Sequence, residues 1–249
     1  MASKTSSATS STKSQAAAQT LPEIDIERMF ELGCHLGHPI AKWHPKMAPF
    51  IYGAESGIHL FDLVKTAEQL QQACQLFFDI AKDNKQLLLV GTKRSTRDII
   101  KQAAEQIGCF YINSRWMGGL LTNFEQLRKS IERMSQIETG LKTGQFDKYT
   151  KYERVQLEKE QTKLERFFIG LQGLKGKPDY IFVVDPQKEK IAVREANLTG
   201  VPVIALADSN ADPRPLSLVI PANDDSAKSI QYVVDQLVAA YQAGLAARS

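Results

Sequence analysis

The residues that most clearly suggest a chemical function are lysines, arginines and tryptophans in three short segments. In the first segment, Lys42 and Lys46 lie on either side of Trp43, and prolines stiffen the loop. A tryptophan between two cations can stack on a base or a sugar while the lysines pair with phosphates. The alternative is that Trp43 anchors an irregular loop to the core, as lone aromatic residues often do. The segment is therefore a candidate RNA-binding loop with a structural alternative.

The second segment reads GTKRS at residues 91–95 and stands between an apolar run and a helical pattern. Backbone N–H groups at a helix start can hold a phosphate, and Lys93, Arg94 and Arg97 add positive charge. The segment has neither the GxxxxGK(S/T) spacing of a P-loop nor the GxGxxG spacing of a dinucleotide-binding fold. We therefore expect it to bind RNA phosphates. The alternatives are a plain turn, and a nucleotide-binding α/β enzyme that uses Gly91 to Ser95 as its phosphate loop.

The third segment reads NSRWMGGLLTN at residues 113–123 and follows another apolar run. Arg115 and Trp116 come just after this predicted strand, at the edge where doubly wound folds bind ligands. The two glycines that follow permit a close backbone approach. From the three segments together, the predicted RNA-binding residues are Lys42, Trp43, Lys46, Lys93, Arg94, Arg97, Arg115 and Trp116.

Metal and catalytic chemistry are less well supported by the residue pattern. Cys34, His35 and His38 are neighbours with His44 nearby, but no second pair completes a zinc-binding spacing. The chain has no GxSxG serine, credible Cys–His dyad or repeated metal carboxylates. We therefore predict no metal, no cofactor and no catalytic residue, and we expect a protein that is not an enzyme. The carboxylates after predicted strands are expected to cap helices and turns: Asp185, Asp208, Asp212, Asp224 and Asp225.

The elements that must hold these segments alternate between apolar runs and amphipathic helices. Strands are predicted at residues 86–90, 109–112, 180–184, 203–207 and 218–220. Helices are predicted at residues 24–32, 62–81, 95–107, 189–198 and 226–243, and a loop-rich stretch at residues 34–57. Strands that are continuously apolar are typical of a parallel sheet covered by helices on both faces. The pattern thus predicts an α/β fold with a doubly wound, flavodoxin-like parallel sheet.

One segment, residues 123–174, interrupts this alternation because it contains no strand pattern. Its apolar residues recur at heptad-like spacing on both sides of a turn near Gly144, which predicts an inserted antiparallel coiled-coil helical hairpin. Such an arm can reach a distant partner. The predicted organisation is a disordered Ser/Thr-rich tail at residues 1–22, a sheet domain at residues 23–122 and 175–245, and the hairpin at residues 123–174.

The charge distribution and composition are typical of a protein that binds a polyanion through one face. The 249 residues carry a net charge of +3, with 25 basic and 19 acidic residues up to residue 178 and 6 basic and 9 acidic residues after it. Three widely spread cysteines favour a reducing compartment. No apolar run approaches the roughly 18–20 residues of a membrane-spanning helix, so no membrane association is predicted. The tail has no secretory core, and it lacks the arginines usual in organellar transit peptides.

Several longer blocks together resemble the family of the universal small-subunit ribosomal protein number two. The first blocks are MFELGCHLGH from Met29, KWHPKMAPFI from Lys42, GIH from Gly57, DLVKT from Asp62, GTK from Gly91 and RWMGGLLTN from Arg115. The later blocks are PD from Pro178, Glu195, GVP from Gly200, DSNADP from Asp208 and IPANDD from Ile220. The resemblance covers about residues 24–245, so it is more specific than any single motif.

This resemblance implies a doubly wound α/β domain with a coiled-coil hairpin and a structural role in the small ribosomal subunit. The implied partners are small-subunit rRNA, between head and body on the solvent side, and other small-subunit ribosomal proteins, including the large mRNA-binding protein number one. The hairpin and the IPANDD block resemble bacterial or plastid members. The expected location is thus a bacterial cytoplasmic ribosome, with a plastid or other organelle ribosome as the alternative. The Ser/Thr-rich tail departs from the typical bacterial member.

Overall fold

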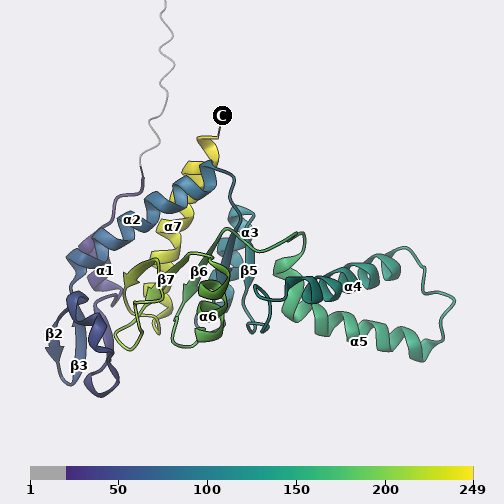
Figure 1. Cartoon of the computed structure of the whole chain (residues 1–249), viewed down its shortest axis with the longest axis horizontal. Coiled ribbons are helices and arrows are strands. Elements are labelled where there is room, and N and C mark those ends of the chain that lie inside the picture. Colours follow the sequence, from purple (N-terminus) through teal and green to yellow (C-terminus); the bar gives the residue numbers. More distant parts are fainter. Residues whose placement is uncertain (1–20, 249) are drawn as a thin grey trace, which may run out of the picture.

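Five apolar runs of the sequence form a parallel sheet, because their side chains can be buried on both faces. The computed structural model describes residues 21–248 of the chain. The strands are β4 (Leu87–Val90), β5 (Phe110–Ile112), β6 (Tyr180–Val184), β7 (Val203–Ala207) and β8 (Leu218–Pro221). Their spatial order is β5-β4-β6-β7-β8, and each strand is parallel to its neighbours (Figure 1). This is the 2-1-3-4-5 order of flavodoxin-like folds, so the predicted fold class is confirmed.

Helices cover both faces of the sheet, and alternate strand residues point into two separate cores. The helices are α1 (Ile26–Glu31), α2 (Leu63–Lys82), α3 (Arg97–Ile107), α6 (Lys190–Thr199) and α7 (Ala227–Ala246). Leu87 and its alternate neighbours pack against α2, α3 and α7, whereas Leu88 packs in the core on the α6 side. Helix α3 after β4 and helix α6 after β6 therefore lie on opposite faces, as expected for a doubly wound sheet.

A second, antiparallel sheet has two of its three strands in the stretch at residues 34–57 that the sequence analysis treats as loop-rich. Strands β1 (Leu36–Pro39), β2 (Ile51–Glu55) and β3 (Ile58–Phe61) pair in the order β1-β3-β2. Ser56 and Gly57 connect β2 to β3, and both have positive φ angles, 50° and 81°. Two such residues form the tight turn of a β-hairpin. The loop prediction is wrong for β1 and β2, because prolines and glycines in and beside these short strands give the segment the composition of a loop.

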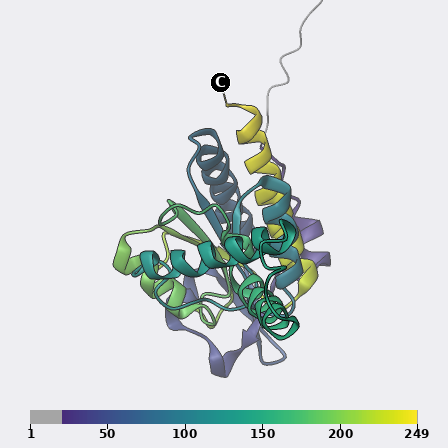
Figure 2. The same ribbon diagram turned by 90° about the vertical axis from the view of Figure 1, so that its right-hand side faces the viewer.

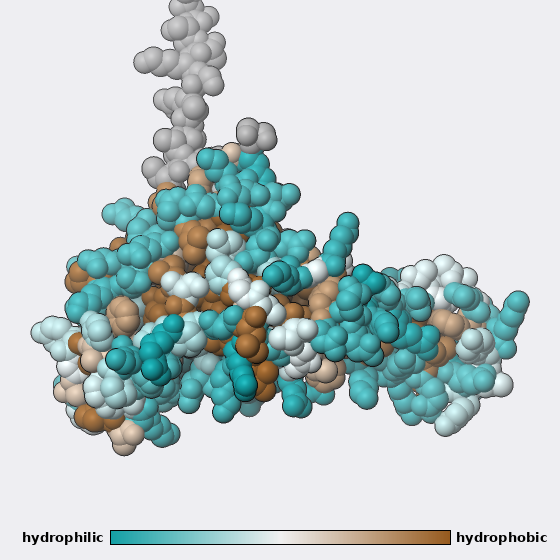
Figure 3. Space-filling view, in the orientation of Figure 1, coloured by the Kyte–Doolittle hydropathy of each residue, from teal (hydrophilic) through white to brown (hydrophobic). Residues whose placement is uncertain are grey.

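The two helices predicted between residues 123 and 174 are present as α4 (Phe124–Lys142) and α5 (Lys151–Phe168). They lie side by side and project from the sheet domain (Figures 1 and 2), and a two-pronged ion pair joins Arg133 to Glu160 at 3.1 Å. Hydrophilic side chains cover most of the visible hairpin surface (Figure 3). Ile131 and Phe168, near the root, belong to the core on the α6 side. Coiled-coil packing and an independent hairpin unit stay predictions.

The first residues of the described chain are already part of the sheet domain. Leu21 packs half-buried against the core that α2 and α7 share, so the packed chain includes a residue that the sequence analysis assigns to the tail. The rest of the predicted disordered tail, residues 1–20, lies outside the described residues. Within residues 21–248, no helix is both long and apolar enough to cross a membrane.

Candidate nucleic-acid interface

The carboxyl ends of β4, β6, β7 and β8 meet at one edge of the parallel sheet, and the predicted segments reach this edge from two directions. The loops after the strands bring the carboxylates and the cations of residues 91–97. The antiparallel sheet is held against the same edge, because the His38 amide donates to Asp208 Oδ1 and to Ser209 Oγ at 3.0 Å each. The His44 amide adds a bond to the Ser209 carbonyl at 2.7 Å.

Lys93 lies inside this edge rather than on its surface. Its Nζ atom pairs with Asp185 and Asp224 at 2.6 Å each and with Asp225 at 2.8 Å, and the side chain is only 16% exposed. Burial alone would lower the pKa of Lys93, but the surrounding carboxylates outweigh it and raise this pKa above its ordinary value. Lys93 thus joins the loops after β4, β6 and β8. This geometry differs from the predicted contact with a phosphate.

Asp224 is the most deeply buried member of this ionic cluster. It is 0% exposed, and its Oδ2 atom has no hydrogen-bond partner in the described chain. Burial and the nearby charge of Asp185 raise the pKa of Asp224 to about 7, although Lys93 acts in the opposite direction. The four aspartates of this cluster therefore outnumber Lys93 and the neighbouring His38, which pair with them. The members of the cluster are Lys93, Asp185, Asp208, Asp224 and Asp225.

Among the described residues, the group that could hold a metal ion shares His38 with the set considered in the sequence analysis, but two aspartates take the place of Cys34 and His35. Within residues 21–248, the ligand atoms of His38, Asp208 and Asp224 lie within 4.8 Å of one another, and nitrogen and carboxylate oxygens are donors that zinc accepts. Cys34 is buried in the main core, and His35 stacks on Phe30 with ring centroids 4.3 Å apart. His38 Nδ1 already pairs with Asp208 at 2.9 Å, which raises the pKa of His38.

The loop around Trp43 presents cations and an aromatic ring to solvent. Trp43 is 37% exposed, and its ring packs at a tilt against the ring of His59, with the two ring centroids 5.0 Å apart. Lys42 and Lys46 are exposed, and neither forms an ion pair in the described chain. One ring face thus packs on the protein while part of the ring stays open, which is compatible with both predicted roles.

Three predicted arginines are exposed near the same edge. Arg94 and Arg97 follow β4, and Arg115 follows β5. Arg97 Nε donates to the Thr92 carbonyl at 3.0 Å, which directs the guanidinium across the loop. In the described chain no carboxylate lies within ion-pair distance of any of the three. They are therefore free to meet an external anion.

Trp116 is not placed to stack on a base, because it is only 6% exposed. Its indole nitrogen donates to Glu195 Oε1 at 3.2 Å, and the same carboxylate accepts from the amides of Gly119 at 2.8 Å and Leu121 at 3.1 Å. Glu195, itself 7% exposed, thus holds the whole loop after β5. The sequence analysis gives Glu195 no such role. The signal that could have identified this role is the position of an acidic residue on the apolar face of the helix, beside Ala196.

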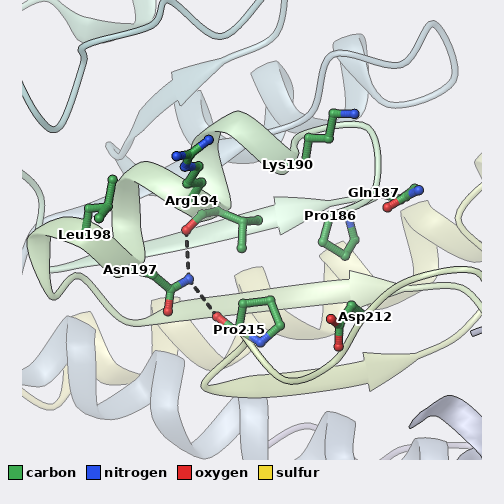
Figure 4. Close-up of a pocket in the computed structure, with 9 residues that line it drawn as sticks. Pro186, Gln187, Lys190, Arg194, Asn197, Leu198, Asp212 and Pro215 are labelled. Atoms are coloured by element: carbon green, nitrogen blue, oxygen red, sulfur yellow. Dashed lines mark hydrogen bonds between the residues drawn. The ribbon is translucent and has the colours of Figure 1, made fainter. Parts of the chain in front are cut away.

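A separate cavity of about 430 Å³ lies between α6 and the connection from β7 to β8 (Figure 4). Asn197 Nδ2 bridges its wall by donating to the Val193 carbonyl at 2.8 Å and the Pro215 carbonyl at 2.9 Å. Lys190 and Arg194 lie along α6 on one side of this cavity. Its lining contains none of the predicted RNA-binding residues.

The fold and the edge define a class of protein. It is a doubly wound α/β protein whose ligand edge is braced by a lysine–aspartate cluster and surrounded by exposed cations. Residues 29–244 match the model of the family described as ribosomal protein S2. The chain belongs to the ribosomal protein S2 family. This confirms the resemblance on which the sequence analysis relies.

Similar proteins from three bacteria are each named small ribosomal subunit protein uS2. The protein from Geotalea uraniireducens is 38% identical over 229 residues, which cover 92% of this chain and 90% of that protein. The protein from Chloroflexus aggregans is 40% identical over 225 residues, covering 90% and 94%. The protein from Bdellovibrio bacteriovorus is 40% identical over 224 residues, covering 90% and 72%. These relatives are named as ribosomal proteins, so the alternative of a nucleotide-binding enzyme is not favoured.

Proposed function

We propose that this chain is a structural constituent of the small ribosomal subunit that binds rRNA and neighbouring ribosomal proteins during translation. Membership of the family and the names of the relatives support the assignment to the small subunit. The observation that carries RNA binding is a set of exposed cations around one sheet edge, all without carboxylate partners in the described chain. This set is Lys42, Lys46, Arg94, Arg97 and Arg115, with Trp43 beside it.

The residues at this edge divide into two roles. The exposed cations pair with phosphates and release the counterions of the RNA, while the open part of Trp43 offers a surface for a base or a sugar. Lys93 and Trp116 support the interface from within the fold. Lys93 joins three strand-end loops through ion pairs, and the Trp116 indole donates a hydrogen bond to Glu195. The buried groups hold the loops in the conformation that presents the arginines.

The protein partners and the location follow from the family resemblance. We include the large mRNA-binding small-subunit protein number one among the neighbours. Exposed apolar side chains such as Tyr52, 81% exposed, and Phe30, 61% exposed, are available for protein contacts. A bacterial cytoplasmic ribosome is the proposed location, because the relatives come from bacteria, and an organelle ribosome is the alternative.

Co-sedimentation tests the proposal directly. The full chain, carrying a tag, is expressed in a bacterium and the lysate is separated on a sucrose gradient. We expect the tagged chain in the small-subunit fractions, and we expect it to leave them after a high-salt wash because phosphate contacts are weakened by salt. Recovery of all tagged chain at the top of the gradient, with an intact fold by circular dichroism, would overturn the proposal.

A further inference from the structure

A cavity of about 490 Å³ opens where the hairpin root meets the sheet domain. Thr92 follows β4, Arg115 follows β5 and Lys188 follows β6, while Arg166 and Phe167 come from the end of α5. Strands β4 and β6 are neighbours whose following helices lie on opposite faces of the sheet. This is the topological switch point, the crevice in which doubly wound folds bind their ligands.

The cavity is lined by four cations and one carboxylate. Arg97, Arg115, Arg166 and Lys188 are all exposed, and none of them has an ion-pair partner in the described chain. The carboxylate of Glu189 is 5% exposed and accepts a short hydrogen bond from the Thr92 hydroxyl, so it faces the protein. Four like charges around one space raise the local positive potential, which attracts an anion.

An apolar wall accompanies the cations. Phe167 is half-buried at the hairpin root, and the Arg166 guanidinium lies 5.6 Å from the centre of its ring. Ile191, 55% exposed, lies on the first turn of α6 and lines the same cavity. Aromatic faces with arginines beside them are the platforms on which proteins stack unpaired bases. The cavity therefore combines the two chemistries of a nucleotide, a phosphate and a flat base.

We infer that this cavity takes one nucleotide of the bound RNA, with its phosphate among the four cations and its base against Phe167. The volume lies within the range of about 300–1,000 Å³ that ligand cavities span. This inference rests on the proposed function, because it assumes that the chain binds RNA. It adds Arg166, Phe167 and Lys188, which lie outside the segments that the sequence analysis selects, and it gives the hairpin root a share in recognition.

The test uses the full chain and a bacterial small-subunit rRNA transcript. The variant Arg166→Ala/Lys188→Ala removes two cavity cations, and Lys190→Ala/Arg194→Ala is the matched control because it removes the same charge from α6 beside the other cavity. We expect Kd to rise at least about tenfold for the cavity variant, with a salt slope lower by about 0.7–0.9 for each phosphate lost. The control variant is expected to change Kd less than threefold.

A third variant, Phe167→Leu, keeps an apolar side chain but removes the ring. We expect a Kd about fivefold or more higher with an unchanged salt slope, because stacking involves no counterion release. Thermal unfolding checks that each variant is folded. Wild-type Kd and slope in the cavity variant, or an equal loss in the control, would overturn the inference. Failure of the wild-type chain to bind the transcript would instead overturn the proposed function.

A free nucleotide or phosphate shares part of this chemistry, so calorimetric titrations with adenosine monophosphate and inorganic phosphate form a separate arm. We expect at most millimolar affinity, because the loop at residues 91–95 lacks a phosphate-binding fingerprint. Micromolar binding of adenosine monophosphate that competes with the transcript would assign the cavity to a soluble nucleotide and overturn the inference.

Discussion

Removal of the Lys93 charge should destabilise the fold more than it weakens RNA binding. In Lys93→Met the side chain keeps a similar length, but Asp185 and Asp224 lose the cation that lies 2.6 Å from each. Breaking a buried ion pair by removing one partner costs about 3–5 kcal/mol. Because Lys93 is 16% exposed, we expect the lower end, about 3 kcal/mol of the free energy of unfolding. That is a large share of the roughly 5–15 kcal/mol that stabilises a folded protein.

Urea unfolding followed by circular dichroism measures this loss, and Arg94→Ala is the matched control on the neighbouring residue. Arg94 is exposed and has no ion pair in the described chain, so its removal should change the free energy of unfolding by no more than about 0.5 kcal/mol. The same two variants are compared for RNA binding. Arg94→Ala should weaken binding while Lys93→Met, measured where it is folded, should not reduce the salt slope.

The pH dependence gives an independent check. The folded pKa of Asp224, about 7, lies above the unfolded value of about 3.9, so the folded state binds a proton between these values. Stability from this group is therefore present at low pH and is lost as pH rises toward 7. Without Lys93 the pKa of Asp224 rises further, so the loss in Lys93→Met should shrink by about 0.8 kcal/mol between pH 7.5 and pH 5.5. The reasoning is refuted if Lys93→Met unfolds like the wild type and lowers RNA affinity as Arg94→Ala does.

Four further outcomes are expected. Glu195→Ala should lower the free energy of unfolding by about 2–4 kcal/mol, since three donors lose their acceptor and two of them, the Trp116 indole and the Leu121 amide, are buried. Thermal unfolding that matches the wild type would contradict this. Replacement of residues 138–161 by a short Gly/Ser linker should leave a cooperative domain that enters small-subunit particles poorly, because the core contacts at the hairpin root remain. Trp43→Ala should raise the Kd for RNA without changing the salt slope, whereas a changed slope would show that the ring positions the lysines. Calorimetry should detect no sub-micromolar binding of ATP, GTP or NAD by the full chain, and such binding would favour the enzyme alternative.

The adjacent residues Lys93 and Arg94 show why the candidate site was only partly predictable. Both are cations in the same turn, and local sequence gives them equal claims to a phosphate. Their difference comes from Asp185 and Asp224, which are 92 and 131 positions further along the chain than Lys93. Only the parallel sheet brings these carboxylates to the same edge as Lys93, and only their proximity turns one cation inward.

The two tryptophans differ for the same reason. Trp43 and Trp116 each stand beside a cation on a predicted loop, but Trp43 is 37% exposed and Trp116 is 6% exposed. A carboxylate on α6, Glu195, captures the indole of Trp116 together with two loop amides. A single acidic residue on a helix face does not show which loop it will bind, so the spacing of residues in the sequence could not predict this contact.

The sequence by itself determined the central architecture, because its signals are local and strong. Continuously apolar runs of strand length are typical of a parallel sheet that is covered on both faces, and the helical patterns between them supply the cover. The short strands between Leu36 and Glu55 escaped prediction, since their prolines and glycines give a loop composition. The tertiary structure alone decided which cations face solvent and which are paired with carboxylates inside the fold. It also placed the hairpin root beside the switch-point cavity. Those outcomes depend on contacts between residues far apart in the chain, and burial and charge pairing exist only once the fold has brought them together.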